Sequence, residues 1–311
     1  MEQGLQPDHP GLSRFRPGRP RTIGAVRRRS RRGAYALAAP GGGWLLVFFL
    51  IPILAALSIS LQTGNPVTGY SLSWHFGEYS STVSAYGAEF LRSFEYGVIS
   101  TAAAFVISYP IAYWIAFHGG RHKSTLLFLI LLPFFVSFVI RTLAWQFILS
   151  DEGFVLRTLE NLHLLPRGTH VLSTPFAVLA GLTYNALPFM ALPLYVAIEK
   201  IDRRVVRAAT DLYARPSISF LRVILPLSAP GIFAGFLLVF VTNVGDYVNA
   251  EILGGPGTTM IGNIIQSAYL NNLDYPTAAA LSSVLMAGLL IVIWLYARAF
   301  GTESLQEYAA A

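Results

Sequence analysis

Long stretches without charged residues are the feature that most constrains how this sequence can fold. A charge at the centre of a bilayer costs ~2.5–3.5 kcal/mol on insertion scales, and an α-helix needs roughly 20 residues to cross the hydrocarbon. Six stretches satisfy both conditions, and Arg141 is the one charge that interrupts them. They lie at residues 44–61, 98–117, 124–150, 176–197, 223–245 and 275–297. The pattern predicts an all-α integral membrane protein with six transmembrane helices.

The composition agrees with a membrane protein. Of the 311 residues, 54% are hydrophobic and 12% are charged, whereas soluble domains carry about 25% charged residues. The high hydrophobicity also excludes disorder for most of the chain. The sequence contains no Cys, which excludes disulfide bonds, Cys-ligated zinc and thiol catalysis.

The basic residues predict the orientation of the chain. Of the 22 Lys and Arg residues, 18 fall on one side of the six predicted spans, and the positive-inside rule assigns this side to the cytoplasm. Both termini are then cytoplasmic. We expect a disordered Arg-rich tail at 1–33, a membrane domain at 34–300 with a cytoplasmic loop at 200–226, and a cytoplasmic tail at 301–311.

One more charge-free stretch, residues 252–273, is too polar to cross a membrane. It begins with Gly254-Gly255-Pro256-Gly257, a sequence typical of turns. Four side-chain amides follow it, on Asn263, Gln266, Asn271 and Asn272. We therefore expect a turn and an external amphipathic helix here.

Several kinds of chemistry have no sequence signature in this chain. The only lysines, Lys123 and Lys200, follow His and Glu, so no Walker A phosphate-binding loop exists. The six His residues form no H-E-x-x-H metal motif, and no G-x-S-x-G nucleophile motif occurs. We expect a chain that is not an enzyme and binds neither a metal nor a cofactor.

The loop at 200–226 contains the most informative segment. Asp202 can cap a helix that runs to about Ala214 and is stopped by Arg215-Pro216. Val205, Ala209, Leu212 and Tyr213 form an apolar stripe on it, and the opposite face is basic. Such a helix either lies on the inner leaflet or enters the groove of a cytoplasmic partner.

Residues 207–226 resemble the E-A-A-x-x-x-G coupling motif of ABC-transporter permeases, with its later I-x-L-P in register at 223–226. Arg207 replaces the usual Glu, and Tyr213 replaces the usual Gly. The resemblance implies that this segment docks on an ATPase. The coupling residues it implies are Arg207, Ala208, Ala209, Asp211, Leu212, Tyr213 and Ala214.

Other motifs resemble those of the spermidine/putrescine-type permeases in particular. These are Leu132-Pro133 followed by 141–145, the segment 184–195, and Gly245-Asp246-Tyr247 followed by 253–255. Together they cover about residues 95–300. The resemblance implies the type I ABC importer arrangement, multi-pass in the inner membrane, and import of polyamines or of a related solute such as iron, an opine, a phosphonate or an amino-acid-like compound.

The same resemblance implies the partners of the chain. They are a cytoplasmic ABC ATPase dimer that binds ATP and Mg²⁺, a second homologous permease, an extracytoplasmic solute-binding protein and membrane lipid, but not nucleic acid. Two other functional classes remain as alternatives. A membrane enzyme would need a cluster of acids or His at one membrane face, and a channel would need a repeated pore loop.

Ionisable residues inside a span are candidate functional residues. Asp246, near the outer end of the fifth span, either neutralises Arg141 of the third span or lines the path of a cationic solute. The remaining polar and aromatic candidates for this path are Trp145, Tyr184, Asn185, Tyr247 and Glu251. Pro188 and Pro193 remove backbone donors from the fourth span, so we also expect a kink there.

Overall fold

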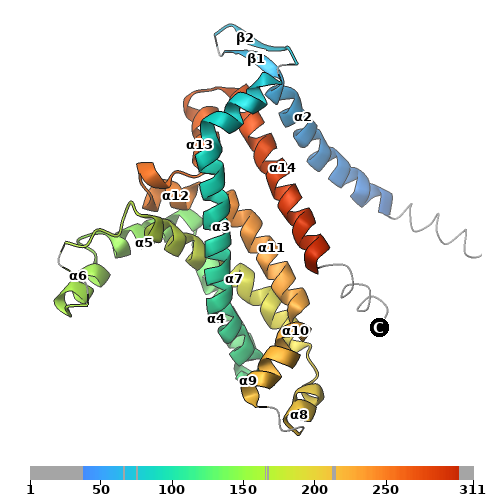
Figure 1. Ribbon diagram of the computed structural model, residues 1–311, viewed down its shortest axis with the longest axis vertical. Coiled ribbons are helices and arrows are strands. Elements are labelled where there is room, and N and C mark those ends of the chain that lie inside the picture. The colour runs from blue at the N-terminus through green and yellow to red at the C-terminus, as the bar shows by residue number, and fades with distance from the viewer. Residues whose placement is uncertain are drawn as a thin grey trace, which may run out of the picture. The chain divides into compact units, whose positions relative to one another are not determined.

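The computed structural model describes residues 38–65, 67–74, 76–164, 166, 168–211 and 215–300 (Figure 1). Its contacts divide the chain into two units, residues 1–54 and 55–311. Apart from one two-stranded hairpin, the described elements are helices, which confirms the all-α prediction. The expected tails at 1–33 and 301–311 lie outside the described residues.

The first predicted span forms a helix over Ala38–Ser60, which includes the π-helical η1 (Leu46–Leu50) and α2 (Ile51–Ser60). Its most apolar 18-residue window has no buried residue. A helix that is apolar on all sides and exposed along its length suits a lipid environment.

Four further helices build the core of the second unit. They are α3 (Gly77–His118), α7 (Pro175–Glu199), α11 (Ala229–Val244) and α14 (Tyr275–Phe300). α3 packs against the other three, and α7 also packs against α11. Small residues make the α7–α11 contact close, because a Cβ on Gly231 would lie 2.4 Å from that of Ala197.

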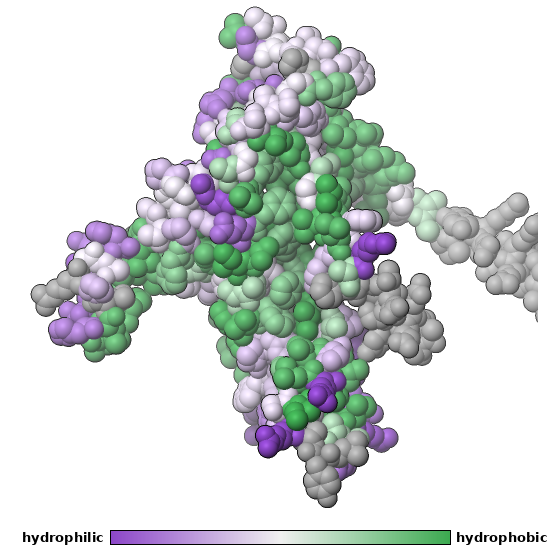
Figure 2. Space-filling model, in the orientation of Figure 1, coloured by the Kyte–Doolittle hydropathy of each residue, from purple (hydrophilic) through white to green (hydrophobic). Residues whose placement is uncertain are grey.

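The outer surfaces of these helices are apolar. Figure 2 shows mainly hydrophobic residues along the central helices of the visible face, interrupted at mid-height by a hydrophilic patch near α12, with further hydrophilic residues near the hairpin at the top and near α8 at the bottom. The exposed side chains include Val98 and Val106 of α3 and Leu290, Ile291 and Trp294 of α14. This band is the surface expected of a protein surrounded by lipid.

The predicted third span is broken. The segment that contains it extends beyond the predicted range on both sides. It comprises η2 (Gly120–His122), α4 (Lys123–Leu131), η3 (Leu132–Phe135), α5 (Phe138–Leu149) and α6 (Phe154–Asn161). The helices bend by 90° between Phe135 and Phe138, where Val136 and Ser137 have extended ψ angles of 139° and 138°. Pro133 has no N–H to donate to the preceding turn, so the backbone hydrogen bonding of α4 is already interrupted three residues before the bend.

The predicted fifth span is bent as well. It comprises α9 (Pro216–Ser219), η4 (Phe220–Ile224), α10 (Leu225–Leu227) and α11, with a bend of 65° at Ser228. Among the described residues, four helices are long and apolar enough to cross a membrane, and six if each bent pair is one span. The structure is therefore compatible with the six predicted spans.

The prolines at which we expect a kink, Pro188 and Pro193, do not interrupt α7. Both lie inside the helix, which continues through them to Glu199. α7 is packed against α3 and α11, and 61% of its most apolar window is buried. Contacts on two sides support the helix where backbone hydrogen bonds are missing.

The remaining elements are short. They are β1 (Gln62–Asn65), β2 (Gly69–Leu72), α8 (Arg203–Asp211), α12 (Val248–Leu253), η5 (Pro256–Thr258), α13 (Ile261–Gln266) and η6 (Ser267–Asn271). β1 and β2 pair antiparallel, with Gln62 opposite Leu72. A turn and a helix do form in 252–273, and the first residues of that helix, Ile261 and Asn263, are buried.

Candidate functional site

Asp246 is held at the start of α12 by the residue three positions later. Its Oδ1 accepts a hydrogen bond from the backbone N–H of Asn249 at 2.8 Å, and its Oδ2 accepts from Asn249 Nδ2 at 3.1 Å. A carboxylate commonly satisfies the free N–H groups of a first helical turn in this way. The contacts fix the carboxylate at the junction between α11 and α12.

Asn249 joins this carboxylate to two other helices. It is fully buried, and its Oδ1 accepts a hydrogen bond from Asn185 Nδ2 of α7 at 3.1 Å. The hydroxyl oxygen of Thr142, on α5, lies 3.4 Å from the same oxygen. Thr142, Asn185, Asp246 and Asn249 are here termed the polar node. It connects α5, α7 and α12.

Gly181 of α7 allows α12 to approach closely enough for these contacts. A Cβ at this position would lie 2.4 Å from Leu253 Cδ1 and 2.7 Å from Asn249 Oδ1. Any larger side chain would push α7 and α12 apart and lengthen the hydrogen bonds of the polar node.

The polar node has unused capacity to accept hydrogen bonds. Asn185 Oδ1 is buried and has no partner among the described residues. Among all the described residues, the ion pairs are Lys123–Glu199, Arg157–Glu152 and His170–Asp151. Asp246 is in none of them and therefore has no cation at salt-bridge distance. A carboxylate and a free amide oxygen are suitable partners for an ammonium group, which carries three donors.

The alternative pairing of Asp246 with Arg141 does not form. Arg141 is buried, and its guanidinium carbon lies 5.2 Å from the ring centroid of Phe134 and 5.8 Å from that of Phe138. Within the described residues, its Nε and Nη1 have no hydrogen-bond partner. The side chain is directed toward aromatic rings of its own segment, while Asn249 occupies both oxygens of Asp246.

Trp145 and Tyr184 meet, with ring centroids 5.3 Å apart. They line a cavity of about 440 Å³, which is bounded by α3, α5 and α7. The structure therefore brings these two candidate path residues together, although their cavity is lined mainly by aliphatic side chains such as Ile99 and Leu179.

Glu251 and Tyr247 lie outside the polar node. Glu251 Oε2 accepts a hydrogen bond from Asn263 Nδ2 at 2.9 Å, and the same nitrogen donates to the backbone oxygen of Tyr247 at 3.0 Å. These contacts fasten α12 to α13. Tyr247 is 43% exposed, and neither side chain contacts Asp246 through a hydrogen bond within the described residues, so their place in a solute path stays a prediction.

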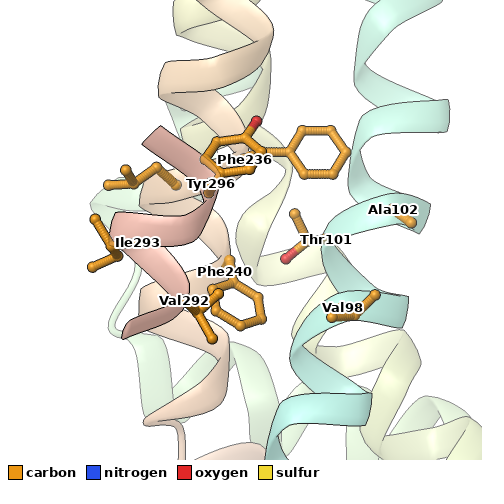
Figure 3. A pocket seen from close by; sticks show the side chains of 9 residues that line it. Val98, Thr101, Ala102, Phe236, Phe240, Val292, Ile293 and Tyr296 are labelled. Atoms are coloured by element: carbon orange, nitrogen blue, oxygen red, sulfur yellow. The ribbon is translucent and has the colours of Figure 1, made fainter. Parts of the chain in front are cut away.

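Another cavity, of about 190 Å³, lies between α3, α11 and α14 (Figure 3). Its labelled residues are Val98, Thr101, Ala102, Phe236, Phe240, Val292, Ile293 and Tyr296. No carboxylate or basic group lines it. A cavity of this character suits an acyl chain or another apolar group and not a charged solute.

α8 begins as the sequence predicts. Asp202 Oδ1 accepts a hydrogen bond from the backbone N–H of Arg204 at 2.8 Å, which is an N-cap contact. Within α8, Val205 and Ala208 are exposed and Ala209 is half-buried. The candidate coupling residues Leu212, Tyr213 and Ala214 lie outside the described residues.

Reasoning from the sequence missed two members of the polar node, Thr142 and Asn249. Asn249 is 107 residues away from Thr142 and 64 away from Asn185, so no local pattern links them. The only available signal was the spacing of Asp246 and Asn249, which places an amide one turn after an acid.

Residues 108–299 match a family model described as "Binding-protein-dependent transport system inner membrane component". The chain is 36% identical over 257 residues to the spermidine/putrescine transport system permease protein PotB of Haemophilus influenzae, covering 82% of this chain and 90% of that one. It is 34% identical over 256 residues to the protein of the same name from Escherichia coli, covering 81% of this chain and 93% of that one.

A solved structure shares the fold. It is a bacterial ABC transporter involved in the import of the acidic polysaccharide alginate, and one of its chains aligns with a TM-score of 0.66 at 17% identity. The alignment covers 90% of this chain and 99% of that one. Most of the chain therefore has the fold of one chain of that transporter.

Proposed function

Because the chain belongs to the family of binding-protein-dependent transport system inner membrane components, we propose that it is the permease subunit of an importer for small polyamines, of the spermidine and putrescine class. Membership makes the chain a multi-pass membrane protein and an ABC transporter subunit, not an enzyme, with ATP hydrolysis in a separate subunit. The polyamine specificity rests on the relatives and on the polar node.

The observation that carries the specificity is the carboxylate of Asp246. It lies in the node without a neighbouring cation, and Asn249 connects it to Asn185, whose Oδ1 has no partner among the described residues. A charged acid in a membrane segment is costly unless it is paired or hydrated. Transient pairing with the ammonium groups of a passing polyamine gives this acid a function that the fold alone does not require.

The proposal assigns a side and a task to each region. The hairpin and the segments 151–174 and 252–274 face outward, where a solute-binding protein delivers the polyamine. A second permease completes the path through the inner membrane. A cytoplasmic ATPase dimer docks on α8 and the residues that follow it, so that closure of the dimer moves the helices around the polar node.

The test is uptake of radiolabelled putrescine into proteoliposomes that contain the complete transporter, with its binding protein outside the vesicle and ATP inside, on the ATPase side. We expect Asp246→Asn to lower the initial rate about tenfold or more, the effect of losing one charge interaction of roughly 1.4 kcal/mol. Asn preserves the shape of the side chain, so the amount of assembled transporter should not change.

Glu152→Gln is the matched control, because Glu152 is an outer-loop acid whose side chain is 87% exposed. It should transport as the unmodified protein does. Equal uptake by Asp246→Asn would remove Asp246 from the solute path. Competition by an iron chelate, an opine, a phosphonate or an amino acid, with none by spermidine, would replace polyamines as the solute class.

A further inference from the structure

A hydrogen bond from Arg203, which lies outside the coupling motif at 207–226, connects α8 to the end of α3. Arg203, the first residue of α8, donates a hydrogen bond from Nη2 to the backbone oxygen of Ala116 at 3.0 Å. Its guanidinium carbon also lies 5.5 Å from the ring centroid of Phe117. A planar guanidinium that both donates and stacks is held more firmly than a freely rotating amine.

The acceptor lies at a position where a helix lacks a donor. α3 ends at His118, and the last carbonyl groups of a helix have no partner inside it. Gly120, four residues after Ala116, has left the helix with a φ of +48°. A cation at this C-terminal end is also favoured by the helix dipole. Arg203 therefore caps α3 from a different element.

A second contact holds the segment that precedes α8. Lys123 Nζ lies 2.7 Å from Glu199 Oε1 and 2.8 Å from its Oε2. Glu199 is the last residue of α7 and Lys123 is the first residue of α4. A negative charge at the C-terminal end of a helix and a positive charge at the N-terminal end are both unfavourable in the field of the helix dipole. Their pairing offsets both unfavourable placements and ties α4 to α7.

Together these contacts anchor both ends of the connection 199–203 to the corner between α3 and α4. We propose that this α3–α8 clasp, formed by Ala116, Lys123, Glu199 and Arg203, transmits the movement of α8 to α3, with Arg203 as its positioning residue. α3 packs against α7, α11 and α14, so a displacement delivered to its end reaches the whole core. The inference rests on the proposed docking of an ATPase at α8.

The experiment measures putrescine moved per ATP hydrolysed by the reconstituted complete transporter. Arg203→Met keeps the apolar stem beside Phe117 and removes the donor to Ala116. We expect hydrolysis and assembly to persist and the transport ratio to fall roughly tenfold, as expected for a lost charge-assisted hydrogen bond. Arg203→Lys should restore part of the ratio, because an amine can donate to Ala116 but does not stack on Phe117 as a guanidinium does. Arg121→Met, on an exposed residue of η2 outside both α8 and the clasp, is the matched control and should leave the ratio unchanged.

Exchange of the charges of Lys123 and Glu199 gives an independent test, because the double variant keeps one positive and one negative side chain at these two positions. Lys123→Glu and Glu199→Lys should each lower the ratio, and the double variant should restore it, with both charges then favoured by their helix dipoles. A normal ratio in Arg203→Met and in both single exchanges would overturn the clasp while leaving the importer intact. A wild-type complex without binding-protein-stimulated ATPase would instead contradict the proposed function.

Discussion

At the scale of the residue, Asn249 is the position on which most of the polar node depends. Asn249→Leu keeps a similar volume but leaves the carboxylate of Asp246 without a side-chain donor. It also removes the nearer acceptor of the Asn185 amide, which then has only the hydroxyl of Thr142 at 3.5 Å. Each buried group that loses its partner costs about 1–3 kcal/mol. We expect the purified protein to unfold several degrees lower and the transporter to lose uptake, measured by thermal unfolding in detergent and by vesicle assay.

Asn271→Leu provides the comparison, since Asn271 is exposed and makes a single long contact of 3.4 Å with Ser267. This variant should unfold at the temperature of the unmodified protein. If the two Leu variants unfold alike, the hydrogen bonds around Asn249 do not contribute to stability.

Gly181 is expected to be intolerant of even one added carbon. Gly181→Ala places a Cβ 2.4 Å from Leu253 Cδ1, and overpacking of this kind costs about 1–3 kcal/mol. Gly245→Ala is the matched control, because the nearest atom to its added Cβ would be 3.7 Å away. Comparison of the membrane abundance of the two variants tests the close approach of α7 and α12, which would be wrong if both accumulate equally.

At the scale of the element, α8 should tolerate no charge on its apolar stripe. Ala209→Asp or Val205→Asp would bury a carboxylate on docking, which costs several kcal/mol without a partner. We expect ATP-driven uptake to disappear while the chain remains in the membrane. Co-purification of the ATPase separates lost docking from lost folding.

Ser84→Asp, on an exposed residue near the start of α3 and outside the segment 207–226, is the control for these variants and should transport normally. Full uptake by both Ala209→Asp and Val205→Asp, with the ATPase still bound, would mean that α8 is only a surface helix.

Proline shows why the bends were harder to predict than the helices. Charge-free stretches identified the long helices, because hydropathy reports burial in lipid. Hydropathy does not report the direction in which a helix runs after a bend. Whether a proline interrupts its helix depends on how the helix packs against its neighbours. Pro133 precedes a bend of 90° in a segment where α4 and η3 have no buried residue. Pro188 and Pro193 lie in α7, which packs against α3 and α11 and continues through both prolines without a break.

The sequence likewise identified only some residues of the site. Asp246 and Asn185 were identified because a polar residue is conspicuous in an apolar stretch. Thr142 and Asn249 became meaningful only when folding brought α5, α7 and α12 together. For Arg141 and Asp246, opposite charges in neighbouring spans suggested a pair, but the capping requirement of α12 engages the acid instead.

At the scale of the whole molecule, the absence of Cys permits a direct test of orientation. A membrane-impermeant maleimide added to intact cells should label Thr68→Cys, in the hairpin turn, and should not label Ser217→Cys until the cells are opened. The expectation follows from the distribution of Lys and Arg across the predicted spans. Labelling of Ser217→Cys from outside would invert the topology.

The bends at 136–137 and at Ser228 also bear on the energy barrier to conformational change. Within lipid, no water replaces a backbone hydrogen bond that is broken when a straight helix flexes. Pro133 precedes the first bend, and Pro226 and Pro230 flank the second, and none of them has an N–H to lose. Rotation at these positions breaks fewer bonds than elsewhere, so they are the natural pivots for a membrane domain that must alternate between two shapes.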